Sequence, residues 1–249
     1  MNYDITIPAI QKEWQVPSNQ IPWKDQAIKT LKKIKSNYGQ QFVNASNYTG
    51  VPLPILYGFS AVESGGALNN TLDGFSKGLM QVNPDSCWQT LRDQLKVDTL
   101  QKFYPLYQAA PNAFDVIKPM DNLGYAFKTN KMASEYLQIK PLSPSVVTYC
   151  GQRMVADAQF AVYIGSLILA KLIAGTMKSV GQVRLDHIVI KYNAGSGRFR
   201  QVITSRGLES PSVDTTQVYN NLPIPVSQAY IVKLLGINGY MDIQKKGLA

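Results

Sequence analysis

Residues 54–66 read PILYGFSAVESGG and place one carboxylate, Glu63, near the end of an otherwise uncharged run. Pro54 suits the first turn of a helix, and the Gly-Gly pair that closes the run is typical of a helix end. The pattern predicts a helix over residues 54–64 with Glu63 in its last turn. Glu63 is then either a solvated residue after a core segment or an acid held in an apolar wall, from which it could donate a proton.

The segments on both sides of this run also show helical spacing of apolar residues, and strand signals are weak. We therefore expect a mostly α protein. The expected helices cover residues 23–38 (ending at Gly39), two or three segments between Cys87 and Gln138, residues 152–175, residues 182–193 (stopped by AGSGR) and a short final segment within NLPIPVSQAYIVKLLG (221–236). Residues 67–86 are expected to form a loop with one ordered piece, KGLMQVNP.

The formal net charge of the chain is +9, which indicates a polyanionic partner such as nucleic acid, anionic lipid or bacterial cell wall. The densest basic cluster, residues 29–35, spaces its lysines like the solvated face of an amphipathic helix. Basic and aromatic residues do not alternate as they do in single-strand-binding surfaces, so we expect no nucleic-acid partner.

Two features of the chain bear on its location. The N-terminus has neither the positive charge nor the apolar run of a secretory signal peptide. The apolar stretch 160–170 is shorter than the ~20 residues that cross a membrane, which predicts a buried core helix and no transmembrane segment.

Cysteine and histidine are rare. Cys87 and Cys150 are the only two cysteines, far apart in sequence, and two separate buried thiols are favoured over a single bridge. His187, the single histidine, is expected to be a structural helix residue. We expect no metal and no cofactor.

Three short motifs occur in a specific order: AVESGG (61–66), KGLMQVNP (77–84) and KYNAGSGR (191–198). In content and order they resemble the Slt-type lytic transglycosylases, goose-type-lysozyme-like enzymes that cleave bacterial peptidoglycan. The apolar stretch DAQFAVYIGSLILAKLI (157–173) also resembles a core helix of that family, so the likeness covers about residues 50–236.

The resemblance implies a lysozyme-like α-helical catalytic domain over residues 23–240. The spacing after Pro84 is longer than in the minimal family domain, which indicates an insertion or an expanded lobe at about 90–150. Residues 1–22, rich in Pro, Gln and Asn, would be an N-terminal arm, and residues 241–249 a C-terminal tail.

The resemblance also implies site residues. Glu63 would be the catalytic acid and later the base. Substrate contacts would come from residues of all three motifs and from one further tyrosine: Ser64, Gly78, Met80, Gln81, Tyr192, Asn193 and Tyr230. Ser64 could instead fix the helix end, and Met80 could equally be a core residue.

Glycoside cleavage requires an acid that still holds its proton near neutral pH, whereas a free Glu has a pKa of about 4.3. Leu56 and Phe59 precede Glu63 by seven and four residues, on the same helix face, and could raise its pKa by desolvation. Most glycosidases need a second carboxylate, for which Asp73 and Asp85 are the nearby candidates, although each suits a turn. In the resembling family the substrate's own N-acetyl group attacks instead, and the product has a 1,6-anhydro end.

The chain departs from the family pattern at two points. Where the family has Glu-Thr-Arg before a Tyr, this chain has Val226-Ser-Gln228 before Tyr230, so a carboxylate is missing. An Asn of the family's core helix is replaced by Ala161.

Peptidoglycan glycan strands are thus the expected substrate of a lytic transglycosylase. The alternatives are a lysozyme of the same fold that hydrolyses the same bond, and a cell-wall-binding structural protein without activity. Without a signal peptide, action in the periplasm or cell wall requires delivery, for which a phage particle or lysis system is favoured. Virion, tail or envelope-complex proteins would then be partners.

Overall fold

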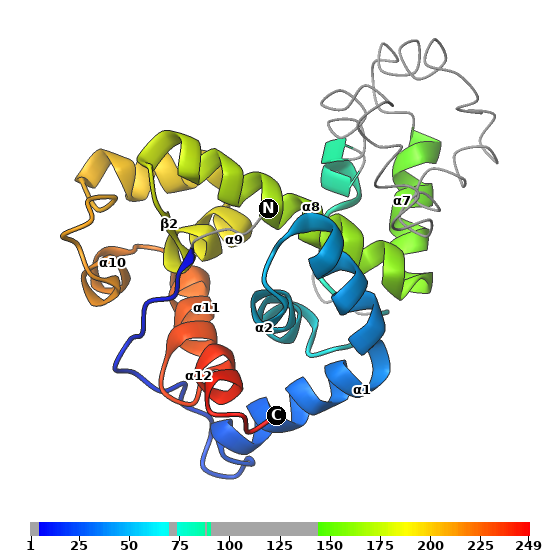
Figure 1. Cartoon of the computed structure of the whole chain (residues 1–249), viewed down its shortest axis with the longest axis horizontal. Coiled ribbons are helices and arrows are strands. Elements are labelled where there is room, and N and C mark those ends of the chain that lie inside the picture. Colours follow the sequence, from blue (N-terminus) through cyan, green and yellow to red (C-terminus); the bar gives the residue numbers. More distant parts are fainter. Residues whose placement is uncertain (1–4, 70–73, 88, 91–143) are drawn as a thin grey trace. The chain divides into compact units, whose positions relative to one another are not determined.

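A computed structural model describes residues 5–69, 74–87, 89–90 and 144–249 of the chain (Figure 1). The fold divides into two compact units. Unit 1 comprises residues 1–39, 50–66 and 168–249, and unit 2 comprises residues 40–49 and 67–167. The helices expected between Cys87 and Gln138, and most of the lobe expected at 90–150, lie outside the described residues.

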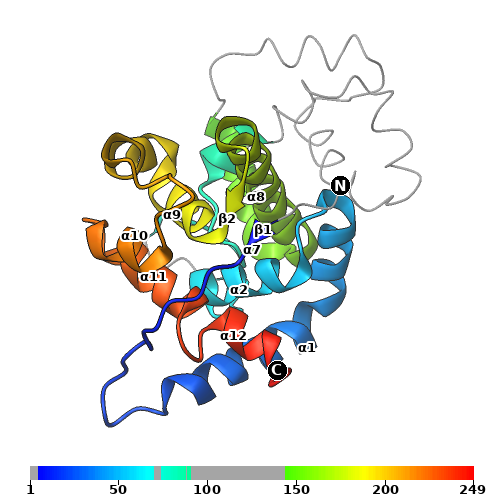
Figure 2. The ribbon, with the colours of Figure 1, turned by 60° about the vertical axis from the view of Figure 1, so that its left-hand side comes forward.

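The described part of the chain is mostly helical, as predicted. Its helices are α1 (Trp23–Thr49), α2 (Leu53–Ser64), α7 (Pro144–Ala156), α8 (Ala158–Val180), α9 (Leu185–Val202), α10 (Thr215–Asn221), α11 (Pro225–Leu235) and α12 (Tyr240–Lys245), with a 3-10 turn at Thr204–Arg206. Two short strands, β1 (Ile5–Thr6) and β2 (Val183–Arg184), pair in parallel (Figure 2).

The helix α2 confirms the prediction over 54–64 to within one residue. It begins after Pro52 and ends at Gly65, whose φ of 59° is in the left-handed region that glycine adopts without strain. In unit 1, α11 and α12 pack against α2 (Figure 1). The packing is close at Gly58, where an added Cβ would lie 2.6 Å from Cδ1 of Leu234.

The prediction that the first helix ends at Gly39 is wrong, since α1 continues to Thr49. The polar-looking segment after Gly39 contains Phe42 and Ala45, which are completely buried. Burial of this second apolar stripe outweighs the helix penalty of about 1 kcal/mol for one interior glycine. In the first part of α1 the expected pattern holds, with Leu31 buried among exposed lysines.

The prediction of one helix over 152–175 is also wrong, because the segment is divided between α7 and α8. Asp157 separates them: its carboxylate accepts a hydrogen bond from the backbone N–H of Phe160 (3.0 Å) and pairs with Arg153 (3.1 Å). A side chain that caps the new helix in this way favours a break at its own position.

The helix expected over 182–193 begins later and ends later, as α9. Residues 183–184 form β2 instead, because they pair with β1. The predicted stop in AGSGR is present as a kink at Gly195 (φ 82°, ψ 155°), after which the helix resumes to Val202. Phe199 and Val202, both buried, explain why the chain returns to helix beyond the kink.

The segment before α1 packs against the rest of unit 1. In addition to the β1–β2 pair, the N–H of Ile10 donates to the carbonyl of Leu235 (3.1 Å) and the N–H of Ile237 donates to that of Lys12 (2.8 Å). Ile10 is 1% exposed. The final helix α12 was not predicted from the sequence.

The helix α8 contains the longest apolar segment of the described residues, Ala158–Lys178, which by length and composition alone could cross a membrane. Of its most apolar window, 56% is buried inside the fold. A core helix of this length meets the same criterion, so the assignment to the core, without a membrane span, stays a prediction.

Two glycines of α8 give a matched test of packing. A Cβ at Gly165 would lie 2.4 Å from both Cβ and Cγ of Met80, whereas a Cβ at Gly175 would meet nothing within 4 Å. We expect Gly165→Ala to lower the free energy of unfolding by about 1–3 kcal/mol through overpacking. Gly175→Ala should raise it by up to about 1 kcal/mol through helix propensity. Urea unfolding followed by circular dichroism measures both, and equal effects would contradict the packing at Gly165.

Candidate active site

The predicted acid lies at the end of α2, beside an aromatic cluster in unit 1. The ring of Phe59, completely buried, contacts the rings of Tyr192 on α9 (5.1 Å between centroids) and Tyr230 on α11 (5.5 Å). Phe59 precedes Glu63 by one helical turn, so its ring and the carboxylate share a face of α2. We call Phe59, Glu63, Tyr192 and Tyr230 the Glu63 cluster.

The electrostatics of the cluster link both tyrosines to Glu63. Burial raises the pKa of Tyr192 and of Tyr230 well above the usual value, and the negative charge of Glu63 raises each pKa further. A neighbouring carboxylate acts in this way because it disfavours a second negative charge nearby. Both hydroxyls are therefore protonated at neutral pH and can donate hydrogen bonds.

Tyr230 is the more enclosed of the two, with 3% of its surface exposed. Its hydroxyl is close enough to Glu63 for a hydrogen-bond contribution to raise its pKa, yet within the described chain it has no partner that meets full hydrogen-bond geometry. Because the buried Tyr230 hydroxyl lies near a carboxylate without a completed hydrogen bond, it can donate a hydrogen bond to a third group.

The neighbouring motif residues have distinct environments. Ser64 is buried; its Oγ donates to the carbonyl of Ser60 and accepts from the N–H of Gly66, both at 3.1 Å. It therefore fixes the end of α2, one of the two roles considered for it. Asn193 is exposed on α9, and its Oδ1 accepts a hydrogen bond from Ser227 at 2.7 Å. Ser227 uses one lone pair of that oxygen, so the Asn193 amide can still donate through its nitrogen and accept through its second lone pair.

The second motif forms a tight turn in unit 2. Lys77 and Val82 exchange two backbone hydrogen bonds of 3.0 Å, and the turn between them has Gly78 at φ 73° and Gln81 at φ 45°. A positive φ is uncommon for a residue other than glycine. Gln81 is held there because its side-chain Nε2 donates to the carbonyl of Gly78 (2.8 Å).

Two residues of this turn, Gly78 and Met80, are buried inside unit 2 rather than exposed to a ligand. A Cβ at Gly78 would lie 2.5 Å from the backbone oxygen of Met154, which explains the glycine by close approach as well as by its φ. Met80 is completely buried, with Gly165 against its side chain. The expectation that Met80 touches sugar is therefore replaced by the other role considered for it, a core residue.

The structure thus gathers Glu63, Ser64, Tyr192, Asn193 and Tyr230 within unit 1, and Gly78, Met80 and Gln81 within unit 2. Of the two candidates for a second carboxylate, Asp85 is an exposed residue of unit 2, and Asp73 lies outside the described residues. Among the described residues no group of three or more His, Cys, Asp or Glu side chains could hold a metal ion.

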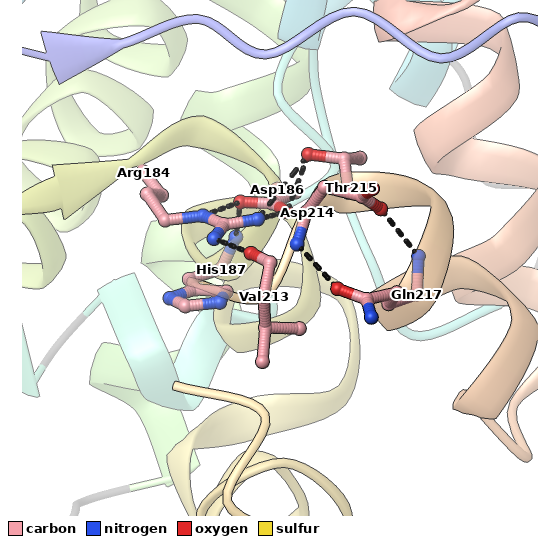
Figure 3. A network of polar contacts seen from close by, with 7 residues as sticks. All are labelled: Arg184, Asp186, His187, Val213, Asp214, Thr215 and Gln217. Carbon is pink, nitrogen blue, oxygen red and sulfur yellow. Dashed lines mark hydrogen bonds and ion pairs between the residues drawn. The ribbon is translucent and has the colours of Figure 1, made fainter. Parts of the chain in front are cut away.

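A buried ion pair anchors the start of α9, the helix that carries Tyr192 and Asn193 (Figure 3). Arg184 and Asp186 form two hydrogen bonds, of 2.7 and 3.1 Å, and their side chains are 8% and 0% exposed. Thr215 donates to Asp186 (2.9 Å), and Arg184 also donates to the carbonyl of Val213. Sequence reasoning missed this network, although two opposite charges inside the apolar stretch VRLDHIVI were a usable signal.

His187 follows Asp186 and is buried in α9, as expected of a structural residue. Its Nε2 has no hydrogen-bond partner in the described part of the chain. Burial lowers the pKa of His187; Arg184 and Lys191 lower it too, while Asp186 and Glu209 act in the opposite direction. The imidazole is therefore neutral in the folded protein at neutral pH.

A pH dependence of stability follows from the neutral imidazole. Because the folded pKa lies below the unfolded value of 6.5, the unfolded chain binds the proton first, and stability is lost as the pH falls below 6.5. We expect a slope of up to about 1.4 kcal/mol per pH unit from this group. Urea unfolding of the wild type and of His187→Leu between pH 7.5 and 5 measures it. Parallel profiles would show that His187 makes no such contribution.

No family model matches the chain, and neither curated proteins nor solved structures give a match. The resemblance to lytic transglycosylases therefore depends on the sequence motifs alone.

Proposed function

We propose that the protein is a peptidoglycan lytic transglycosylase on a lysozyme-like helical fold. The observation that supports this most is the Glu63 cluster: one carboxylate beside a buried phenylalanine and two protonated tyrosine hydroxyls. Carboxylic acids that act as proton donors are found in such apolar surroundings, because burial disfavours the ionised form.

In the proposed reaction Glu63 protonates the oxygen of the β-1,4 bond between N-acetylmuramic acid and N-acetylglucosamine. The N-acetyl carbonyl of the muramic residue attacks the anomeric carbon as that bond breaks. Glu63, now a carboxylate, removes the proton of the 6-hydroxyl, whose oxygen attacks the anomeric carbon; the bond from that carbon to the N-acetyl oxygen breaks as the 1,6-anhydro ring closes. Hydrogen bonds from neutral tyrosines to the carboxylate would stabilise it between the two proton transfers.

The substrate would be the glycan strands of the wall, whose anionic polymers suit a chain of net charge +9. The enzyme would act in the periplasm or the wall after delivery by a phage particle or lysis system, with virion, tail or envelope-complex proteins as partners. Nucleic acid and cofactors have no role in it.

Mass spectrometry of the fragments released from purified peptidoglycan tests the proposal. We expect muramic ends in the 1,6-anhydro form, in amounts that grow with time and are absent from a digest without protein. Reducing ends that carry an added water would overturn the transglycosylase and leave the hydrolase. Binding to the wall without release of fragments would overturn both enzymes and leave a cell-wall-binding protein.

Tyr230→Phe is expected to separate activity from stability. Loss of the hydroxyl should lower the cleavage rate by about 10–100-fold, as for other donors that stabilise charge at a reacting centre. Because this buried hydroxyl has no completed hydrogen bond, its removal should leave stability unchanged or raise it by up to about 1 kcal/mol.

Tyr240→Phe is the matched control for this variant. Tyr240 is also buried, and burial raises its pKa to about 12, while an interaction of its hydroxyl with Thr30 acts in the opposite direction. Its loss should cost about 1 kcal/mol of stability and leave the cleavage rate unchanged. Initial rates and urea midpoints of the two variants measure both effects; a normal rate for Tyr230→Phe would remove that hydroxyl from the mechanism.

A further inference from the structure

Cys87 and Cys150 are 63 positions apart in the sequence, but they lie on two segments that pack together inside unit 2. The helix α7 carries Cys150 and Gly151, and a Cβ added at Gly151 would lie 3.3 Å from Cγ of Pro84. Pro84 begins the helical turn that contains Cys87, whose N–H donates to the carbonyl of Asn83 (2.9 Å). The contact between backbone segments therefore occurs next to both cysteines.

The two thiols lie near each other at this contact. Cys87 is completely buried and Cys150 is 1% exposed; both are free thiols, and Cys150 is close enough to raise the pKa of Cys87. The expectation of two buried thiols without a bridge is thus confirmed, and the structure adds that the two thiols are neighbours. Two neighbouring thiols on segments in contact need only a small movement to reach disulfide geometry.

We propose that Cys87 and Cys150 form a redox-active dithiol, which closes to a disulfide between α7 and the turn after the KGLMQVNP motif when the protein meets an oxidant of the disulfide class. One thiolate attacks the oxidant's disulfide, forming a mixed disulfide and releasing one thiolate of the oxidant. The second cysteine thiolate then attacks the protein sulfur and releases the other. The protein loses two protons and two electrons, and the oxidant becomes two thiols. This inference does not depend on the proposed function.

The surroundings indicate how fast the reaction is. Burial raises the pKa of Cys87, the hydrogen bond and charge of Cys150 raise it further, and only Arg153 acts in the opposite direction. The Cys87 thiol is therefore protonated at neutral pH, and since the thiolate is the nucleophile, its reaction is slow and depends on local opening. A pair of this kind stays reduced in a thiol-rich compartment and closes after prolonged exposure to an oxidising one.

The test uses the full chain, incubated with oxidised glutathione or with dithiothreitol. In the oxidised sample we expect no thiol titratable after denaturation, an intact monomer mass lower by two hydrogens, and a peptide map that joins the peptides of Cys87 and Cys150. The melting temperature should rise by several degrees over the reduced sample, because the bridge limits the unfolded chain. The Cys150→Ser variant should show no oxidant-dependent change in melting temperature.

Three results would overturn the proposal. They are two thiols still titratable in the denatured oxidised protein, glutathione adducts without an internal bridge, and disulfide-linked dimers as the main product. The peptide map of the wild type decides between these outcomes even if the serine variant does not fold.

Discussion

Glu63→Gln is expected to lower the rate of peptidoglycan cleavage by about 10²–10⁴-fold, the usual contribution of a positioned acid or base. Glutamine keeps the shape of the side chain and its hydrogen-bonding capacity but has no proton to deliver. Initial rates of fragment release measure the effect. The fold should be retained, because Glu63 lies at the end of α2, where Ser64 and Gly65 make the helix-terminating interactions.

The same variant should also change the pH at which two tyrosines ionise. Since the charge of Glu63 contributes to the raised pKa of Tyr192 and Tyr230, both tyrosines should ionise at lower pH in Glu63→Gln than in the wild type. Ultraviolet titration of the phenolate band detects this change without any substrate.

Glu13→Gln is the matched control for charge. Glu13 lies in the segment before α1 and accepts a hydrogen bond from Asn238 (2.7 Å), which a glutamine oxygen would preserve. Its rate of cleavage and its tyrosine titration should equal those of the wild type. If Glu63→Gln also cleaves at the wild-type rate, Glu63 is not the acid and the proposed mechanism is wrong.

Asp186→Ala is expected to destabilise the protein by about 3–5 kcal/mol, because it leaves the charge of Arg184 buried without its partner. Thr215 loses its acceptor in the same step. Guanidinium or urea unfolding measures the loss. Because the network anchors the start of α9, activity should fall together with stability rather than independently of it.

Two control variants test whether the unpaired charge of Arg184 causes the loss of stability in Asp186→Ala. Lys246→Ala removes an ion pair of similar length, 2.6 Å to Asp242, but an exposed one, and should cost no more than about 1 kcal/mol. The double variant Arg184→Met, Asp186→Leu removes both charges and should recover much of the lost stability. If the double variant is as unstable as Asp186→Ala, the unpaired charge is not the reason for the loss.

Local signals in the sequence were sufficient for α2 and for α11. Each has a proline in its first turn, and α2 has a glycine in the left-handed conformation directly after its last residue. These are backbone requirements of one or two residues, so they can be predicted without knowledge of the fold. The helical class follows from the same kind of information, namely the periodicity of apolar residues.

Helix ends that depend on distant partners could not be predicted in this way. Gly39 is an ordinary stop signal, but burial of Phe42 and Ala45 carries α1 past it. Residues 183–184 read as the start of a helix, yet pairing with Ile5 and Thr6 makes them a strand. In each case the deciding interaction joins residues that a local pattern does not contain.

The candidate site shows the same division. By itself, the sequence determined that Glu63 ends an apolar helix and that the Tyr-Asn-Ala-Gly motif lies on a later one, because both properties are local. Only the tertiary structure decided that Phe59 brings Tyr192 and Tyr230 to that acid, that Met80 is buried, and that Cys87 lies beside Cys150. Burial and the distance between charges are set by packing among residues far apart in the chain, and these two quantities determine how an acid, a hydroxyl or a thiol reacts.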